Sequence, residues 1–411
     1  MTDRTGQTRT HAIAAFAVAG LLLLTFSLRV WNLWVADLTF DEVATVFVAR
    51  RPLLDVIRYV MGAAREHPPF YYLMMSLWMR WAGTSEFAIR FPSALIGVLS
   101  VAWGIRLGSR LLCRQGAWWS ALLLAIMPFS VWAGRTGRMY ALVLLLSMMV
   151  MDAWVRWLNR PDRWHWLSFV ALSAIGAMTH YYLLLLWPVQ GLLLLLLPRR
   201  TQPIRRVWTG TIAALSLVVG LFIAVSPGIR AMVLEIGKRF PVWGFRGDEL
   251  GIVITDLYLW AYRPELFWAG LVGLTLTVAG WVWAWRRRDE LGTAGALLAA
   301  WGLLPLALLN FVPERMETRY LTPIFPALLF GIAALVRYLR YRSLRLLAAI
   351  GLALFGLWRL PLLYRTPDTT FSRRVEILHA AATPDDALLM NGPWPGLLLT
   401  YYRPPELLDV H

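Results

Sequence analysis

The sequence is poor in charge, cysteine and lysine, and the shortage of charge excludes a class of protein. Charged residues make up only 16% of the 411 residues, against 59% hydrophobic residues, and the mean hydropathy is +0.57. These values exclude a water-soluble globular protein and indicate a polytopic membrane protein. Cys113 is the single cysteine, so no disulfide can form within the chain. Lys238 is the only lysine, and the net charge of +16 therefore comes almost wholly from arginine.

Several catalytic motifs are also absent. The sequence has no glycine-rich phosphate loop and no nucleophile elbow, which argues against a nucleotide donor and against a serine hydrolase. It has neither internal repeats nor a low-complexity linker. The arginines lie in short clusters between apolar runs, which is the pattern of cytoplasmic membrane loops rather than of a nucleic-acid-binding surface. We therefore expect no nucleic-acid partner.

The apolar runs predict an all-α membrane protein with about 11 transmembrane helices. Two runs are ambiguous by hydropathy, namely the short segment 68–81 and the long segment 164–198. If the first does not cross and the second crosses twice, the arginine clusters "RLGSRLLCR", "RWLNRPDRW", "PRRTQPIRR", "RRRDE" and "RYLRYRSLR" all fall on the cytoplasmic side. The predicted crossings are residues 11–31, 88–107, 116–134, 139–157, two within 164–198, 207–225, 266–285, 291–312, 320–336 and 344–363.

This topology places the amino-terminus in the cytoplasm and the carboxyl-terminus outside. The first run is long and no small-residue cleavage site follows it, so we interpret it as a retained membrane helix rather than a signal peptide. Residues 1–363 would form the transmembrane domain. Residues 364–411 would form a short exterior tail of one helix and one short strand, too small for an independent domain. In the first outer loop, residues 54–66 have an amphipathic helical pattern suited to the membrane interface.

Most of the unusual polar residues then lie on the outer side, which suggests an active site at that surface. Two adjacent acids, Asp41 and Glu42, occur in "FDEVATVF" just after the first crossing. A carboxylate there can accept a proton from an attacking hydroxyl, and a neighbouring acid can orient it. The alternative is that the two acids simply begin a helix, where negative charge favours the helix dipole.

Two arginine pairs follow at the outer ends of later crossings, Arg135 with Arg138 and Arg315 with Arg319, the latter pair followed by Tyr320. Arginine is a planar, permanent cation that binds phosphate with two donors, so these residues are candidates for a lipid phosphate. The alternative is that the arginines snorkel to any nearby lipid headgroup.

Two histidines complete the outer set. His67 lies in "EHPPFYYL" and His180 interrupts the apolar run "MTHYYL". Each could instead be structural, in a proline-stiffened loop and in a turn respectively. Carboxylate and imidazole suit several divalent metals, so Asp41, Glu42, His67 and His180 are candidate metal ligands, although no fixed ligand spacing supports such a site.

Taken in order, "FDE", "HPPFYYL", "EFAIRFPSALIG", "GRMYAL", "THYYLLL" and "RYLTPIFP" resemble the GT-C superfamily of glycosyltransferases that use polyprenyl-phosphate sugars. The likeness is to the bacterial family 39 type, which is related to protein O-mannosyltransferases and to the aminoarabinose transferase. It extends over most of the membrane portion.

The resemblance implies a GT-C fold and an enzyme of the cell (inner) membrane that acts on its outer face. Asp41 would be the general base beside Glu42, and the sugar would move with inversion from a polyprenyl-phosphate donor to a hydroxyl of a protein, lipid or glycan. Arg138 and Arg319 would stabilise the leaving phosphate, and His67 and Tyr71 would shape the sugar pocket.

The chain departs from the family pattern at one position, and two other functions are alternatives to a transferase. Several relatives have a second acid just before the Arg-x-Tyr element, where this chain has Arg135, Thr136 and Gly137. This weakens a two-carboxylate or metal-bridged mechanism and leaves a divalent metal as the one candidate cofactor. The alternatives to a transferase are a transporter or flippase of lipids or lipid-linked sugars, and a noncatalytic membrane scaffold.

Overall fold

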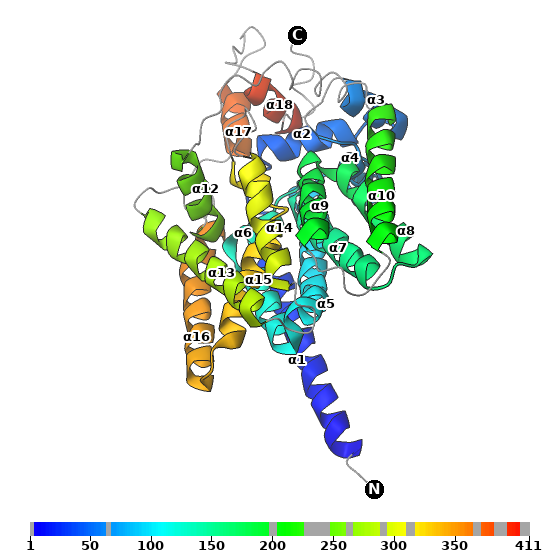
Figure 1. Cartoon of the computed structure of the whole chain (residues 1–411). Coiled ribbons are helices and arrows are strands. Elements are labelled where there is room, and N and C mark those ends of the chain that lie inside the picture. Colours follow the sequence, from blue (N-terminus) through cyan, green and yellow to red (C-terminus); the bar gives the residue numbers. More distant parts are fainter. Residues whose placement is uncertain are drawn as a thin grey trace.

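The computed structural model describes residues 4–62, 67–196, 204–225, 247–259, 266–287, 294–309, 317–364, 371–381 and 393–402, which form helices and turns with no β-strand among them. Figure 1 shows the helices as a bundle, with the start of α1 at one end and the helices closest to the carboxyl-terminus at the other. The elements are α1 (Arg4–Val30), α2 (Phe40–Ala49), α3 (Leu53–Gly62), α4 (Phe70–Ala82), α5 (Glu86–Ile126), α6 (Pro128–Ala133), α7 (Tyr140–Asn159), α8 (Arg163–Thr179), η1 (Tyr181–Leu185), α9 (Leu186–Leu196), α10 (Ile204–Val225), α12 (Gly247–Leu259), α13 (Phe267–Arg287), α14 (Ala294–Leu309), η3 (Thr318–Leu321), α15 (Phe325–Tyr338), α16 (Arg342–Arg359), η4 (Leu360–Tyr364), α17 (Phe371–Ala381) and α18 (Pro393–Tyr402).

Each apolar run that predicts a crossing overlaps a helix, so the all-α prediction for a membrane protein is confirmed. Helices of sufficient length and apolarity to span a bilayer include 12–30, 140–159 and 342–364. Several others, such as α14 and α15, are apolar but shorter. The exact number of crossings remains a prediction.

The long helix α5 is a hairpin of two helices. Cys113 interrupts it with a positive φ of 61°, and beyond that turn the second half packs back on the first. A Cβ added to Gly108 would lie 2.9 Å from the Cα of Ala117, and one added to Gly104 would collide with Leu124. Glycine at these positions allows the two backbones to approach closely. The separate predicted runs 88–107 and 116–134 are therefore separate helices, although the second ends at Ile126 before Pro128.

The predicted break in the run 164–198 is also confirmed. His180 has extended backbone angles between α8 and η1, and its ring nitrogen Nδ1 accepts a hydrogen bond from the Tyr182 amide at 3.2 Å. The break places His180, which is only 4% exposed, beside His67, with 5.3 Å between the ring centroids.

Two of the predicted cytoplasmic arginine clusters meet around a buried acid on α7. The side chain of Asp152 is fully buried, and its carboxylate forms ion pairs with Arg106, Arg110 and Arg156. A buried carboxylate requires such partners. The contact joins the α5 hairpin to the carboxyl-terminal half of α7.

The helices of the first outer loop and the helices of the tail pack together at one end of the bundle. Figure 1 shows α2, α3, α4, α17 and α18 at the end opposite the start of α1. On α3, Val56 and Val60 face the protein, whereas Leu54 of the predicted amphipathic face is 67% exposed. This leaves an apolar surface on α3 of the kind expected at a membrane interface.

The predicted strand in the tail is wrong, because residues 393–402 form helix α18. Proline is tolerated in the first helical turn, where its missing amide has no intrahelical partner. Leu397, Leu398 and Tyr401 share one face of α18 and pack on the main apolar core. The tail is anchored by polar contacts too, since Ser372 Oγ donates to Asp37 at 2.9 Å and the Leu38 amide donates to the Tyr402 hydroxyl at 2.6 Å.

Candidate active site

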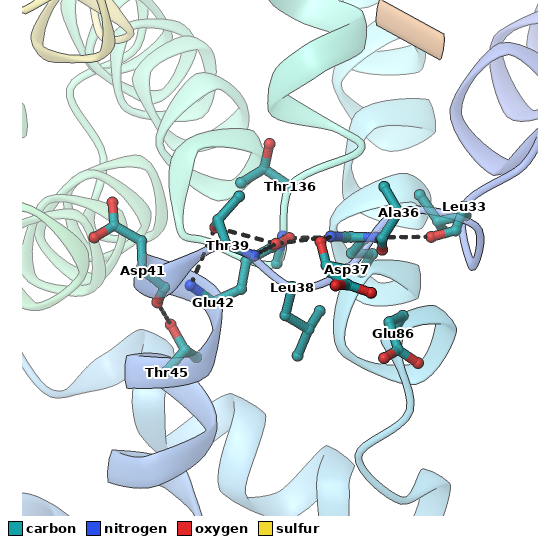
Figure 2. Close-up of polar contacts among 12 residues, drawn as sticks. Leu33, Ala36, Asp37, Leu38, Thr39, Asp41, Glu42, Thr45, Glu86 and Thr136 are labelled. Atoms are coloured by element: carbon teal, nitrogen blue, oxygen red, sulfur yellow. Dashed lines mark hydrogen bonds and ion pairs between the residues drawn. The ribbon is translucent and has the colours of Figure 1, made fainter. Parts of the chain in front are cut away.

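The acid pair lies in the first turn of α2, as the helix-start interpretation predicts. Thr39 is the N-cap: its hydroxyl accepts a hydrogen bond from the Glu42 amide, while a Glu42 carboxylate oxygen accepts one from the Thr39 amide at 2.8 Å. This reciprocal arrangement is a capping box, and it fixes where α2 begins. Figure 2 shows that the side chains of Asp41 and Glu42 point in different directions from this turn.

Glu42 is a buried anchor. Its side chain is 1% exposed, and its two oxygens accept hydrogen bonds from Arg90 Nε and Nη2, each at 2.9 Å, and from the Gly137 amide at 2.7 Å. Burial alone would raise the pKa of Glu42, but the Arg90 guanidinium and the Gly137 and Thr39 amides outweigh it and lower that pKa below its ordinary value. Since both oxygens are occupied, the geometry leaves Glu42 little capacity to contact a substrate.

Arg90 extends the same network into the loop that precedes α2. Its Nη1 donates to the carbonyls of Leu33 and Ala36, at 3.0 and 2.6 Å, and its Nη2 donates to the carbonyl of Asp37 at 2.7 Å. Figure 2 shows these contacts as a nearly continuous line of bonds from Glu42 to Leu33. One guanidinium thus fixes both the acid pair and its loop to the start of α5.

Asp41 points the other way, toward two arginines. Its carboxylate Oδ2 accepts a hydrogen bond from Arg319 Nη1 at 2.6 Å, and about a third of its side chain, 33%, is exposed. Arg138 Nη1 donates to the backbone carbonyl of Asp41 and to the hydroxyl of Thr45, each at 3.1 Å. The structure therefore brings together residues that are 97 and 278 positions apart in sequence.

The two arginines differ in solvent exposure and in their bonding partners. Arg138 is only 4% exposed, and its Nε is buried without a hydrogen-bond partner among the described residues. Arg319 lies on η3 with 32% of its side chain exposed, and its Nε forms a second ion pair with Glu317. An accessible anion near Asp41 would thus meet one fixed and one partly exposed guanidinium.

An aromatic row runs beside these cations. The ring centroids of His67 and His180 are 5.3 Å apart, those of His180 and Tyr182 4.9 Å, and those of Tyr182 and Tyr320 4.9 Å. Burial, followed by the positive charge of Arg138, lowers the pKa of His67 well below its ordinary value and that of His180 to about 3. Both imidazoles are therefore neutral near pH 7 and can exchange hydrogen bonds with a neutral polar ligand.

Two other predicted site residues have different surroundings. Arg135 donates hydrogen bonds to the carbonyls of Leu28, Arg29 and Trp31 at 3.4, 3.1 and 2.6 Å, so it caps the carboxyl end of α1 rather than facing Asp41. Tyr71 is fully buried in the core, whereas the hydroxyl of its neighbour Tyr72 is 3.5 Å from Arg138 Nη1. Arg315 lies outside the described residues.

The four candidate metal ligands do not form one group. In the part of the chain that the structure describes, no cluster of three or more His, Cys, Asp or Glu side chains is arranged to hold a metal ion. The physical reason is that Glu42 is committed to Arg90 and Asp41 is paired with Arg319, which leaves His67 and His180 as an isolated pair.

The sequence patterns did not single out Arg90, Thr45, Tyr72 or Tyr182. A signal for Arg90 was present, because a charged residue inside the apolar run 88–107 requires a buried partner. The other three are ordinary polar or aromatic residues, and only their place in space connects them to the site.

Asp41, Arg138 and Arg319 thus meet at one place in an apolar helical bundle, and comparison with known proteins shows what the chain resembles. The family described as dolichyl-phosphate-mannose-protein mannosyltransferase matches residues 66–228. A curated relative, undecaprenyl phosphate-alpha-4-amino-4-deoxy-L-arabinose arabinosyl transferase 1 of Pseudomonas fluorescens (strain Pf0-1), is 27% identical over 371 residues. The match covers 83% of this chain but only 62% of that relative.

Solved structures show the same fold. ArnT from Cupriavidus metallidurans in the apo state aligns with a TM-score of 0.58 at 18% identity, over 91% of this chain and 69% of ArnT. The same protein bound to undecaprenyl phosphate aligns with a TM-score of 0.56 at 16% identity, over 92% of this chain and 70% of ArnT. A third structure is archaeal oligosaccharyltransferase AglB from Archaeoglobus fulgidus in complex with an inhibitory peptide and a dolichol-phosphate. It aligns with a TM-score of 0.57 at 14% identity, over 90% of this chain and 58% of AglB. The chain therefore has the fold of these membrane glycosyltransferases, and its sequence is similar to that of an arabinosyl transferase.

Proposed function

We propose that the protein is a membrane glycosyltransferase that moves a sugar from a polyprenyl-phosphate donor to an acceptor hydroxyl, with inversion. The observation that carries this proposal is the partly exposed carboxylate of Asp41 beside Arg319 and Arg138. The curated relative is named as an undecaprenyl phosphate-linked arabinosyl transferase, and one ArnT structure contains undecaprenyl phosphate, which supports a donor of this class.

The proposed reaction assigns one role to each kind of group. The acceptor oxygen attacks the anomeric carbon, the Asp41 carboxylate accepts the hydroxyl proton, and the bond from the anomeric carbon to the phosphate oxygen breaks with its electron pair on the phosphate. Arg138 and Arg319 stabilise the charge that develops on this leaving group. A fixed cation such as Arg138 is effective here because it needs little reorganisation as the charge forms.

The remaining residues position the reactants. Glu42 would hold the first turn of α2 through Arg90 and so aim Asp41, rather than react itself. His67, His180 and Tyr320 would line the sugar, where neutral imidazoles can bond its hydroxyls and an aromatic ring can cover an apolar ring face.

We further propose that the enzyme lies in the inner membrane with its amino-terminus in the cytoplasm, its tail outside and its site on the outer face. The five arginine clusters that the predicted topology places on one side support this orientation. The transmembrane domain would comprise residues 1–363, and residues 364–411 would be the exterior tail packed on the first outer loop. The acceptor would be a protein, lipid or glycan hydroxyl.

A deletion strain tests this function. Mass spectrometry of its glycans and lipid intermediates should show an accumulated polyprenyl-phosphate sugar and a glycan, lipid or protein that has lost one sugar. Wild-type protein should restore that sugar, whereas Asp41→Asn at equal membrane abundance should not. Full restoration by Asp41→Asn would exclude the proposed base, and an unchanged set of glycans in the deletion strain would exclude the proposed class of reaction.

The transporter alternative has weaker support. The candidate site residues Asp41, Arg138 and Arg319 meet beside the start of α2, at one end of the bundle, whereas secondary transporters typically bind substrate near the midplane at repeat interfaces. None of the relatives named above is a transporter by its name.

A further inference from the structure

The candidate base is occupied in this structure. Asp41 Oδ2 accepts a 2.6 Å hydrogen bond from Arg319 Nη1 within an ion pair. The hydrogen bond from Arg319 occupies one lone-pair position of the carboxylate, and that position cannot take the proton of the attacking hydroxyl at the same time. Loosening this contact would make both oxygens of Asp41 available to the acceptor.

Of the two arginines beside Asp41, Arg319 is the one able to change partner. Arg138 is nearly buried, and its bonds go to the Asp41 backbone and to Thr45, so it does not hold the Asp41 carboxylate. Arg319 has a third of its side chain exposed, lies on the short element η3 and is divided between the carboxylates of Asp41 and Glu317.

A phosphate would compete directly for the same guanidinium. Arginine binds phosphate through two donors in its planar fork, a geometry as favourable as its pairing with a carboxylate, and a lipid phosphate brings at least one full negative charge. If the guanidinium turns to the phosphate, the Asp41 carboxylate loses its hydrogen bond and becomes available to the acceptor.

Resting on the function proposed above, we propose that Arg319 is a positioning residue that pairs with Asp41 until the donor phosphate takes its guanidinium. The base is then released only after the donor has bound. The sugar donor and the acceptor consequently bind in a fixed order, with the donor first.

A double-mutant cycle on lipid binding tests the exchange without relying on turnover. Undecaprenyl phosphate in detergent micelles is titrated into purified wild-type protein, Asp41→Asn, Arg319→Gln and the double variant. If Asp41 and phosphate compete for Arg319, Asp41→Asn should tighten binding by about fivefold, the upper range for a partly exposed ion pair. That gain should disappear when Arg319 is replaced by Gln.

Two outcomes overturn the exchange. An equal gain from Asp41→Asn in both Arg319 backgrounds would mean that the carboxylate merely repels phosphate through space. No gain, or weaker binding, would mean that Arg319 holds both anions together. Arg319→Lys keeps the charge without the fork, and at an unchanged elution volume in gel filtration it should retain part of the coupling.

Controls separate this inference from the proposed function. Undecaprenol lacks the phosphate and should bind all four proteins equally, since a similar gain with undecaprenol would contradict a phosphate exchange. The exposed pair Asp55 and Arg58, 3.1 Å apart on α3, gives a matched cycle that should show no coupling; equal coupling there would overturn the assignment to Arg319. If wild-type protein binds undecaprenyl phosphate no better than undecaprenol, the proposed function fails as well.

Discussion

Replacing Glu42 with glutamine should unfold the site before it affects any chemistry. The carboxylate accepts hydrogen bonds from Thr39, Arg90 and Gly137. A glutamine of the same shape keeps one acceptor oxygen, but its NH2 group is a donor and would face the N–H donors that now bind the second carboxylate oxygen. Because glutamine is neutral, the buried Arg90 would also lose its counter-charge. Removing one partner of a buried ion pair costs about 3–5 kcal/mol, a large part of the total stability of about 5–15 kcal/mol for a typical domain.

Thermal unfolding of purified protein in detergent measures this loss. Glu42→Gln should lower the midpoint by about 5 °C or more and reduce the amount of folded protein. Asp41→Asn is the matched control on the adjacent residue: its ion pair is one-third exposed and is worth about 1 kcal/mol or less, so its midpoint should change little. The same reasoning predicts acid lability, because the lowered pKa of Glu42 provides stability that is complete above its unfolded-state pKa and is lost as the pH falls through the folded-state value. A Glu42→Gln protein with wild-type thermal stability but no activity would refute the anchor role and make Glu42 a chemical participant.

Three further predictions concern the surroundings of the site. His180 is neutral in the fold because its pKa is about 3, so protonation favours the unfolded chain. The stability that this provides is complete above about pH 6.5 and falls below it by up to about 1.4 kcal/mol per pH unit. Thermal unfolding at pH 7 and pH 5 should therefore show a smaller loss of stability at pH 5 for His180→Gln than for wild-type protein, and an equal loss would contradict the assignment. Arg135→Gln removes the cap on α1 and should lower the unfolding midpoint while leaving the KM for the donor within about twofold, because capping bonds are worth about 1 kcal/mol each; a tenfold rise in KM would restore Arg135 as a phosphate ligand. Tyr402→Phe removes the acceptor of the Leu38 amide and should speed hydrogen exchange in the loop before α2 by about fivefold, whereas unchanged exchange would show that the tail does not secure this loop.

The helices could be predicted well because they obey local rules. Apolar runs of about 20 residues and the placement of arginines are properties of neighbouring residues, and they correctly predict the two halves of α5 and the break at His180. The predicted helix of the tail is confirmed as α17, but the predicted strand is wrong because local rules do not decide the structure of that segment. Residues 393–402 contain two prolines and β-prone aromatic residues, and only the core that Leu397 and Tyr401 contact makes a helix the better solution.

The site was harder to predict because its roles depend on distant contacts. Asp41 and Glu42 are chemically alike and adjacent, so their spacing does not separate them, and only the family resemblance favours Asp41 as the base. Their difference arises from Arg90 and Arg319, one of which buries Glu42 while the other meets Asp41 at an exposed position. Arg135 and Arg138 are likewise equivalent in sequence, and they differ only because the carbonyls at the end of α1 occupy Arg135.

Transfer by reconstituted protein tests the central claim most directly. Proteoliposomes containing purified wild-type protein, a radiolabelled polyprenyl-phosphate sugar and the acceptor identified from the deletion strain should release one polyprenyl phosphate for each new glycosidic bond, with inverted anomeric configuration. Asp41→Asn should form no such bond while still binding the donor. Movement of the labelled lipid between leaflets by wild-type protein, with no new glycosidic bond, would contradict the account.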